Sequence, residues 1–341
     1  MDTRLQSLQA WLASELRGEP FSLAPASEDA SFRRYFRATL ATGATYVVMD
    51  APPDKEDCGK FARIAGMLRH AGVSAPELHA ADYARGFLLL SDLGRETYLQ
   101  VLLSGQAGEA EIEGLYADAL DALIKWQLAS TAGALPPYDD ALLRRELGLF
   151  PDWYVSRHLG RTLADSQRST LERINALLVD SALAQPSVYV HRDYMPRNLM
   201  RCEPNPGVLD FQDAVLGPIT YDLASLMRDA FISWEEPRVL DWCIRYWEKA
   251  RRAHLPVRGD FSEFYRELEW MGLQRHMKVL GIFARIRYRD GKPRYLEDAP
   301  RFLAYARAVA GRYPALAPLL KLLDELHDRY DAEPPAGGDS R

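Results

Sequence analysis

The spacing of hydrophobic residues divides the chain into two parts of different character. The first part opens with hydrophobic residues at helical spacing over residues 4–17, and a second helical pattern covers Lys55–His70. Short strand-like runs lie around this second pattern: Phe21–Leu23, Phe32–Leu40, Thr45–Met49, Glu77–His79 and Phe87–Leu90. Strands in this order, with one helix among them, predict an antiparallel sheet that carries a helix.

The pattern changes to helices after Ser91-Asp92-Leu93-Gly94. Helical periodicity covers Tyr98–Leu103, Ile112–Leu128, Leu142–Phe150, Leu171–Leu178, Leu223–Phe231, Val239–Ala250, Phe261–Arg289 and Arg301–Arg312. We expect only a loop and a hairpin, between residues 191 and 210, to interrupt these helices. Residues 332–341 are rich in proline, glycine and aspartate and are expected to form a disordered tail. The predicted fold class is α+β, with a small antiparallel β-sheet lobe over residues 1–92 and a larger, mainly helical lobe over residues 93–331.

Composition and charge exclude several classes of protein. A chain of 341 residues is long enough for two lobes with a cleft between them. The net charge of −6 gives no reason to expect a nucleic-acid partner, and the three cysteines match no zinc or redox pattern. We find no signal-peptide pattern and no apolar run near the roughly 20 residues that a membrane span needs. We therefore expect a soluble, cytoplasmic protein.

One segment carries most of the chemical information. It runs from His191 to Asn198 and continues, twelve residues later, in the sequence Asp-Phe-Gln-Asp that begins at Asp210. A cluster of turn residues at 203–207 predicts that Leu199–Cys202 and Gly207–Asp210 pair as a hairpin. In that hairpin Leu199 would lie opposite Asp210, so that Asn198 and Asp210 would converge at one end.

An amide oxygen and a carboxylate held together in this way suit Mg²⁺. This ion prefers hard oxygen ligands and shares them with the phosphates of a substrate. Asp193, on the preceding loop, can then reach a substrate hydroxyl and take its proton. Together, Asp193, Asn198 and Asp210 point to phosphoryl transfer.

These residues resemble the catalytic loop and metal motif of the protein-kinase-like small-molecule kinases, the aminoglycoside phosphotransferase and choline kinase group. Asp193 matches the catalytic aspartate of that family, and Asn198 and Asp210 match its two magnesium ligands. In the family, the aspartate at the position of Asp222 braces the catalytic loop, and the histidine at the position of His191 pins the loop backbone. The resemblance implies a two-lobe kinase fold that uses ATP and Mg²⁺.

The resemblance also implies where the nucleotide binds. The segment after the last strand of the small lobe matches the hinge, where family members hydrogen-bond adenine through backbone groups. The first turn of the small lobe would cradle the phosphates, although it contains no glycine. The residues expected to bind nucleotide are Ser31, Phe32, Arg33 and Arg34 in the turn, and Leu90, Ser91, Asp92 and Leu93 at the hinge.

One departure from the family concerns the third strand. That strand lacks the lysine that kinases normally direct at the α- and β-phosphates. Candidate replacements are Arg33, Arg34, Lys55 and Lys60. The departure leaves a nucleotide-binding scaffold without turnover as an alternative to a kinase.

Arg192 occupies the position where regulated protein kinases carry an arginine that reads a phosphorylated residue. The chain has no room for a long activation segment between Asp210 and Gly217-Pro218. We therefore expect Arg192 to form a local salt bridge.

Three patches indicate the acceptor. Ser31–Arg37, Ala51–Asp57 and Gln274–Arg285 look most like the anomeric kinases of N-acetylmuramate and N-acetylglucosamine, which phosphorylate the sugar's C1 hydroxyl in cell-wall (peptidoglycan) recycling. The resemblance implies an amino sugar and ATP as the partners, and it leaves the choice between the two sugars open. An anomeric hydroxyl is more acidic than an ordinary alcohol, so an aspartate base is chemically adequate. The alternative acceptor is another small alcohol, such as an aminoglycoside, choline or homoserine.

A basic helical face gives independent support for an anionic substrate. Residues 271–294 contain seven lysine or arginine residues and one acidic residue. Arg275, Lys278, Arg285 and Arg289 fall close to one face of the predicted helix. Such a face would repel a cationic aminoglycoside and attract the lactyl carboxylate of N-acetylmuramate, with Arg275 or Arg285 as the contact. A solvated basic face paired with acidic neighbours is the open alternative.

Three further residues are candidates for contact with the substrate. Trp153 and Tyr154 can stack on a sugar face, or they can belong to the hydrophobic core. Asp213 can bind a second metal ion or contact the substrate, or it can cap the following loop. The residue types leave these alternatives open.

Overall fold

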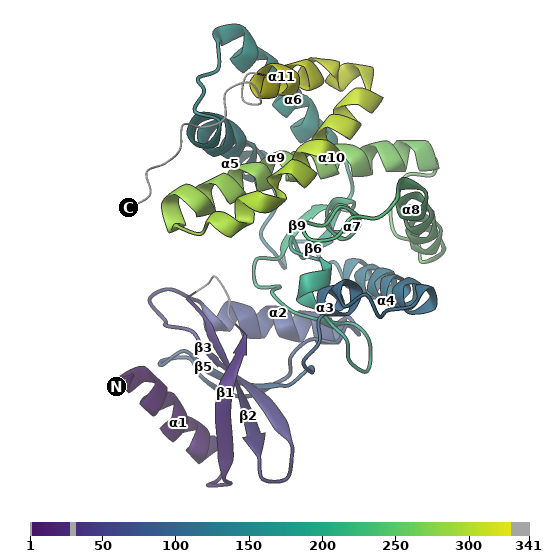
Figure 1. Ribbon diagram of the computed structural model, residues 1–341. Coiled ribbons are helices and arrows are strands. Elements are labelled where there is room, and N and C mark those ends of the chain that lie inside the picture. The colour runs from purple at the N-terminus through teal and green to yellow at the C-terminus, as the bar shows by residue number, and fades with distance from the viewer. Residues whose placement is uncertain (1, 28–31, 329–341) are drawn as a thin grey trace. The chain divides into compact units, whose positions relative to one another are not determined.

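The structure, a computed structural model, describes residues 2–27 and 32–328, and these residues form two compact units (Figure 1). The first unit combines residues up to Ala129 with Pro196–Ala214. The second combines Ser130–Met195 with the residues from Val215 onward. The predicted lobe boundary at residue 92 remains a prediction. The tail expected at residues 332–341 lies outside the described residues.

The first unit is built on a five-stranded antiparallel sheet, as predicted. The strands occur in the order β1 (Phe21–Ser27), β2 (Arg34–Leu40), β3 (Thr45–Asp50), β5 (Phe87–Ser91) and β4 (Leu78–Asp82). Helix α1 (Thr3–Glu15) buries Leu8, Trp11 and Leu12 in one cluster with strand residues such as Val48 and Phe87. This apolar cluster fixes the sheet, from which the nucleotide-binding residues are expected to project.

Further helices belong to the same unit. Helix α2 (Cys58–His70) begins later than expected, because the Asp57 side chain accepts hydrogen bonds from the backbone of Gly59 and Lys60 and caps the helix. The remaining elements are α3 (Tyr98–Leu103), α4 (Glu109–Leu128), the 3₁₀ turn η2 (Pro196–Asn198), β7 (Leu199–Met200) and β8 (Gly207–Val208).

The predicted register of the hairpin is wrong. Leu199 pairs with Val208, not with Asp210, and the strands are only two residues long. The ladder ends there because Asp210 has a φ of 61°, a left-handed conformation that cannot continue a strand. The backbone N–H of Leu209 still donates to the carbonyl of Asn198 at 2.9 Å, so the two predicted metal ligands flank the end of the hairpin.

The second unit is mainly helical and is organised around one long helix, α9 (Phe261–Asp290). Around it pack α5 (Asp140–Leu149), α6 (Asp165–Leu183), α7 (Tyr221–Met227), α8 (Glu236–Arg252), α10 (Ala299–Arg312) and the π-helical segment η1 (Phe150–His158). Short 3₁₀ segments η3 (Pro293–Asp298) and η4 (Pro314–Leu316) flank α10, and the described chain ends in α11 (Ala317–Asp328). The mainly helical character is as predicted. None of the helices in the described ranges is long and apolar enough to cross a membrane.

Two expectations for this unit are wrong. A strand pair, β6 (Ser187–Val190) with β9 (Val215–Pro218), also interrupts the helices. The helix expected to reach Phe231 ends at Met227, because the Asp229 side chain accepts hydrogen bonds from the backbone of Phe231 and Ile232 and holds a turn there.

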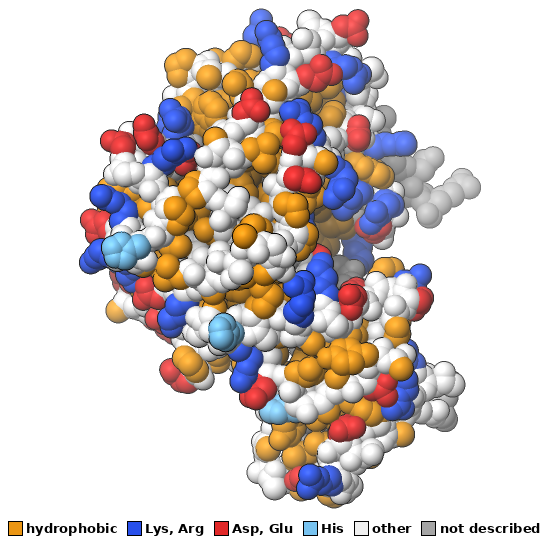
Figure 2. Space-filling model, turned by 180° about the vertical axis from the view of Figure 1, so that it is seen from behind, with side chains coloured by type: hydrophobic (Ala, Val, Ile, Leu, Met, Phe, Trp, Pro, Cys, Tyr) orange, Lys and Arg blue, Asp and Glu red, His pale blue; other side chains and the backbone are white. Residues whose placement is uncertain are grey.

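The surface is mixed in charge. Figure 2 shows basic and acidic side chains interspersed over the visible face, with hydrophobic side chains scattered between them. This distribution agrees with a chain that contains 42 basic and 48 acidic residues.

The packing of α9 depends on a glycine. A Cβ atom added at Gly281 would lie 2.4 Å from the backbone carbon and oxygen of Leu149, at the junction of α5 and η1. Backbone atoms cannot move aside as a flexible side chain can. Helix α9 can therefore approach this junction only without a side chain at position 281.

We predict that Gly281→Ala destabilises the protein by about 1–3 kcal/mol, because the cost of overpacking exceeds the helix propensity gained. The matched control is Gly114→Ala in α4, where no atom lies within 4 Å of the added Cβ. This variant should gain up to about 1 kcal/mol. Urea unfolding of both variants measures the difference, and equal stability would contradict the assignment.

Candidate active site

The two predicted metal ligands lie in the first unit, at the end of the β7–β8 hairpin. Asn198 is buried and closes the turn η2, whereas the Asp210 side chain is about one-third exposed at 37%. Gln212 donates to Oδ1 of Asp210 at 2.9 Å and orients that carboxylate. The donor set of one amide and one carboxylate fits Mg²⁺, and metal binding by these residues stays a prediction.

A cavity of about 370 Å³ adjoins these ligands. Its apolar walls come from residues such as Val47 of β3 and Met200 of β7. The four predicted hinge residues, Leu90, Ser91, Asp92 and Leu93, line it together with Asn198 and Asp210. An apolar slot with backbone groups at one end and oxygen ligands among its lining residues suits a nucleotide.

Arg37 holds the predicted hinge segment in place, and the sequence analysis did not identify this role. Its guanidinium contacts both carboxylate oxygens of Asp92, at 2.6 and 3.0 Å, and donates to the carbonyl of Gly94 at 2.6 Å. Burial alone would raise the pKa of Asp92, but Arg37 and the Gly94 N–H bring it below its ordinary value. The only sequence signal for Arg37 was its place at the end of the patch Ser31–Arg37.

The two adjacent arginines of the first turn behave differently. Nη2 of Arg33 lies 3.4 Å from Oδ1 of Asp210, and its Nε lies 3.8 Å from Oε1 of Glu56. Arg34 instead binds Asp50, with its Nε 2.9 Å from Oδ2. Arg33 thus places a largely buried positive charge beside the predicted metal ligand, and Arg34 does not. Phe32 is exposed, and Ser31 lies outside the described residues.

The lysines of this region are engaged in other ion pairs. Nζ of Lys60, on α2, lies 3.1 Å from Oδ1 of Asp213. Lys55 lies 3.6 Å from Asp54 and is mostly exposed. Asp213 therefore has a cationic partner within the first unit, and its expected contact with substrate or a second metal ion stays a prediction.

The part of the predicted catalytic loop that precedes Pro196 lies in the second unit, and hydrogen bonds to its backbone hold it in place. The fully buried carboxylate of Asp222 accepts hydrogen bonds from the N–H groups of His191 at 2.6 Å and Arg192 at 2.9 Å. Nδ1 of His191 accepts from the N–H of Asp193 at 3.2 Å. Arg192 has a φ of 78°, so these contacts hold a strained backbone directly before Asp193. Burial raises the pKa of Asp222 to about 7, although the two N–H groups oppose the shift.

The predicted salt bridge of Arg192 is confirmed, and its partner is Glu146 of α5. The partner was absent from the sequence analysis because Glu146 lies on a helix that carries no recognised motif. Glu146 is nearly fully buried. A buried carboxylate on a helix with an apolar face is the signal that would have identified it.

The aromatic candidates for substrate contact separate into two environments. Trp153 is half-buried on η1. Tyr154 is buried, stacks on Phe150, and its hydroxyl lies 3.1 Å from Nε2 of His327. Core packing therefore accounts for Tyr154, whereas Trp153 retains exposed surface.

The four residues of the predicted basic face lie on α9, but their environments differ. Arg275 is buried and donates to the carbonyl of Arg228 at 3.4 Å, and Arg289 is exposed and pairs with Asp290 at 2.6 Å. Arg285 lies between these extremes: it is half-buried, and no acidic group of the described residues pairs with it. Burial and the nearby charge of Arg289 lower its pKa. Within the described residues, neither Arg275 nor Arg285 forms a salt bridge, and Arg285 is the one of the two that keeps exposed surface.

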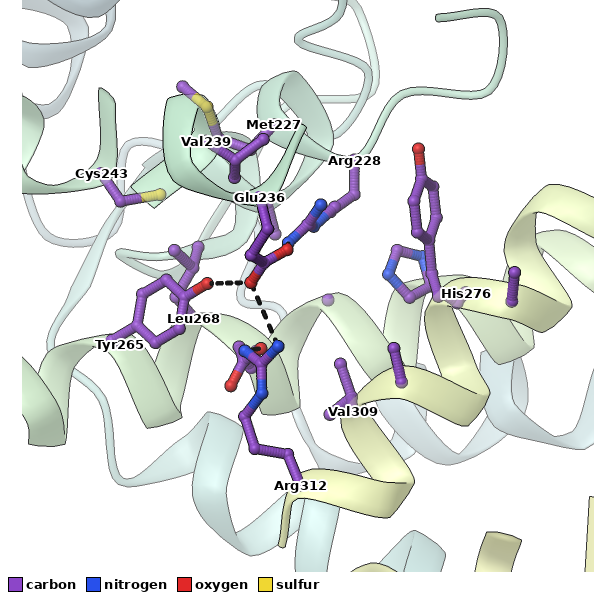
Figure 3. Close-up of a pocket in the computed structure, with 16 residues that line it drawn as sticks. Met227, Arg228, Glu236, Val239, Cys243, Tyr265, Leu268, His276, Val309 and Arg312 are labelled. Atoms are coloured by element: carbon purple, nitrogen blue, oxygen red, sulfur yellow. Dashed lines mark hydrogen bonds and ion pairs between the residues drawn. The ribbon is translucent and has the colours of Figure 1, made fainter. Parts of the chain in front are cut away.

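A second cavity, of about 270 Å³, lies among α7, α8, α9 and α10 (Figure 3). None of the predicted site residues lines it. Its charged groups are already paired: Glu236 accepts from Tyr265 at 2.9 Å and from Arg312 at 3.1 Å, as Figure 3 shows. This cavity is therefore separate from the predicted site residues.

Comparison with known proteins identifies the family. Residues 22–258 match the model of the phosphotransferase enzyme family named APH. An N-acetylmuramate/N-acetylglucosamine kinase of Pseudomonas putida is 55% identical over 335 residues, which cover 95% of this chain and 97% of the relative. A protein of the same name from Pseudomonas aeruginosa is 56% identical over 341 residues, which cover 97% and 99%.

Solved structures resemble the fold. A choline/ethanolamine kinase family protein from Mesorhizobium loti has a TM-score of 0.60 at 15% identity, covering 94% of this chain and 99% of that protein. The macrolide 2′-phosphotransferase of Brachybacterium faecium has a TM-score of 0.58 at 16% identity, covering 87% and 97%. These likenesses confirm the predicted kinase-like fold. The family match over most of the chain, together with relatives that share more than half of its residues, shows that the chain belongs to the phosphotransferase enzyme family.

Proposed function

We propose that this protein is an ATP- and Mg²⁺-dependent kinase that phosphorylates the anomeric hydroxyl of N-acetylmuramate and N-acetylglucosamine. The observation that carries the proposal is the name shared by relatives that are 51–56% identical over nearly the whole chain. Reaction at C1, and a role in recycling peptidoglycan, follow from the resemblance of the three patches described above. The membership of a phosphotransferase family supports the reaction class.

In this proposal Asp193 orients the C1 hydroxyl and takes its proton as the sugar oxygen bonds to the γ-phosphorus of ATP and the bond to ADP breaks. A base placed in this way contributes roughly 10²–10⁴-fold to the rate. His191 and Asp222 hold the backbone of the loop that carries it. His191 and Asp222 would therefore contribute by positioning Asp193, as expected for a reaction in which the protein mainly positions the reactants.

The residues that we propose to bind the phosphates of ATP lie in the first unit. Asn198 and Asp210 would hold Mg²⁺, which neutralises charge on the β- and γ-phosphates when bound. Arg33, beside Asp210, would supply the positive charge that other kinases take from a lysine of the third strand. The hinge and the apolar walls of the 370 Å³ cavity would hold the adenine.

We predict that Asp193→Asn lowers turnover about 100-fold or more and leaves the affinity for ATP nearly unchanged, because the change removes the base and keeps its shape. An assay of ADP release with both amino sugars, aminoglycosides and choline measures the effect and tests the acceptor class. Asp210→Asn is the comparison, since it should instead raise the Mg²⁺ concentration required. More than half of the wild-type turnover in Asp193→Asn would refute the role of the loop.

We predict that Arg33→Ala raises the KM for ATP, or lowers turnover, by about 10- to 150-fold. A charge-assisted contact in a largely buried position is worth roughly 1.5–3 kcal/mol, which corresponds to this range. Arg34→Ala is the matched control, because the neighbouring arginine binds Asp50 instead. Steady-state kinetics with ATP varied will distinguish them. If both variants match the wild type, Lys60 or Lys55 supplies the charge, or no residue does.

We predict that Arg285→Ala lowers kcat/KM for N-acetylmuramate about 10-fold and leaves N-acetylglucosamine nearly unaffected. The two sugars differ by the lactyl ether and its carboxylate, and Arg285 is the partly exposed residue of this face that forms no salt bridge within the described residues. Along α9, Arg285 lies seven residues after the buried Lys278, which corresponds to about 10 Å. A half-exposed contact is worth less than a buried one, so a 10-fold effect is the expected size.

The control for this prediction is Arg289→Ala, which removes an exposed arginine of the same face that pairs with Asp290. It should change neither efficiency by more than about 2-fold. Equal losses on both sugars in Arg285→Ala would assign the residue to the fold or the nucleotide. No loss on either sugar would leave the face as a solvated surface.

A further inference from the structure

The second cavity, of about 270 Å³, is enclosed by α7, α8, α9 and α10 of the second unit (Figure 3). Its walls are mainly aliphatic and come from residues such as Met227, Leu268 and Val309. An apolar cavity of about 150 Å³ is already large enough to hold a benzene ring. The space among these helices is therefore sufficient for a small organic ring compound.

The cavity lies on the side of α7 that faces away from the predicted catalytic loop. Asp222 binds the backbone of that loop, whereas Ala224, two residues later on the same helix, lines the cavity. Residues two apart on a helix point in nearly opposite directions, because each residue turns the helix by about 100°. The cavity is therefore a separate place in the fold and not an extension of the predicted active site.

Charged side chains form one end of the cavity. Oε1 of Glu236 lies 3.1 Å from Nη2 of Arg312, and these two side chains are 45% and 40% exposed. This end is therefore the mouth of the cavity. Arg312 also pairs with Glu269, and Arg228 pairs with Glu236. Among the residues that line the cavity, two cations thus match two carboxylates, so an ionic ligand would bring in a charge without a partner at a high cost.

His276 provides a polar group deeper in the cavity, and Figure 3 shows it apart from the ion pairs at the mouth. The side chain is 1% exposed, and its ring centroid lies 5.5 Å from that of Phe302 and 5.2 Å from that of Tyr305. Nδ1 of His276 is buried and makes no hydrogen bond within the described residues. Burial and the charges of Arg275 and Arg228 lower the pKa of His276 well below its ordinary value, so the imidazole is neutral near neutral pH.

A buried polar atom without a partner destabilises the fold, and a molecule in the cavity that carries the missing partner would offset this cost. A neutral imidazole has one nitrogen that donates and one that accepts. A hydroxyl group can do either, so it suits His276 whichever nitrogen carries the proton. The environment of this side chain thus favours an uncharged ligand with a hydroxyl.

Gly272 of α9 keeps the cavity open. A Cβ atom added there would lie 3.5 Å from Nε2 of His276 and 3.8 Å from Cβ of Ala224, which are ordinary van der Waals distances. Alanine would therefore fit, in contrast to position 281, and it would favour the helix because glycine is a poor helix former. Packing does not require glycine at this position, and its effect is to leave open space between α7 and α9.

We propose that this cavity is a binding site for a small uncharged ring compound with one hydroxyl group, whose ring occupies the aliphatic space behind α7 and whose hydroxyl forms a hydrogen bond with His276. The alternative is a cavity that contains only ordered water bound to the imidazole. Phenol and toluene distinguish the two, because they match in size and shape and differ by a hydroxyl in place of a methyl group.

The test titrates the full chain, isotope-labelled at the methionine methyl groups, with each probe and follows the methyl resonances by NMR. Met227 lines the cavity, so the ring current of a bound probe should shift its resonance until the site is saturated. Met227→Leu assigns that resonance. Met49, which is buried in the first unit, is the internal control and should not shift.

Two variants test the site itself. Gly272→Leu places a side chain in the cavity and should weaken the binding of both probes about 10-fold or more, and Gly114→Leu, where no atom lies within 4 Å of an added Cβ, is the matched control. His276→Phe keeps a ring and removes its nitrogens. It should lower the affinity for phenol relative to toluene by about 2- to 10-fold, whereas His70→Phe, which changes an exposed histidine of α2, should leave the ratio unchanged.

Three results would overturn the inference. If neither probe shifts Met227 in a saturable way, the cavity holds ordered water only. Unchanged binding in Gly272→Leu would mean that the probes bind elsewhere, and an unchanged ratio in His276→Phe would remove the histidine from recognition. Thermal unfolding identifies the folded fraction of each variant. If Gly272→Leu does not fold, Gly272→Ala, whose added atom meets only ordinary contacts, replaces it and should weaken both probes by a smaller factor.

Discussion

The hydrogen bonds from the backbone of the predicted catalytic loop to the buried carboxylate of Asp222 are the constraint on which the rest of the proposed site depends. They hold His191 and Arg192 in place and so fix the direction in which the chain reaches Asp193. The arrangement has a cost in stability. Because burial raises the pKa of Asp222 to about 7, its favourable contribution is complete at acid pH and is lost as the pH rises through that value. Near neutral pH, the partial ionisation of buried Asp222 therefore lowers the free energy of unfolding.

In the first unit, the positive charge beside the predicted metal ligand Asp210 comes from an arginine and not from a strand lysine. The third strand carries no lysine, and Arg33 approaches from the turn before β2 to contact both Glu56 and Asp210. A guanidinium has several donors in a fixed plane, so it can bridge two carboxylates where an ammonium would favour one. Under the proposed function, Arg33 would thus supply from another point of the backbone the cation that a strand lysine supplies in other kinases.

Sequence periodicity predicted the sheet and most helices, because their hydrophobic residues face one core over several turns. Periodicity was less informative where local backbone geometry determined where an element ends. The left-handed backbone at Asp210 shortened the hairpin, and the side chain of Asp229 ended α7 early. The strand β6 was missed because Val188, Tyr189 and Val190 are all buried, so the segment lacks the alternation that identifies a strand.

The sequence offered candidate site residues where they lie in one continuous motif, and it did not indicate side chains that meet only in three dimensions. The predicted metal ligands and the predicted base come from residues 193–210, whereas the buried pair of Glu146 and Lys278 comes from helices far apart in the chain. The predicted basic face of α9 illustrates this limit of sequence analysis. Periodicity placed Lys278, Arg285 and Arg289 on one side of α9, but it could not assign their counter-ions. Lys278 is buried against Glu146, Arg289 is paired at the surface, and Arg285 lacks an acidic partner in the described chain. Residues of the same charge on one helical face therefore have different chemical roles, which depend on their burial and on the acids that the other helices bring to them.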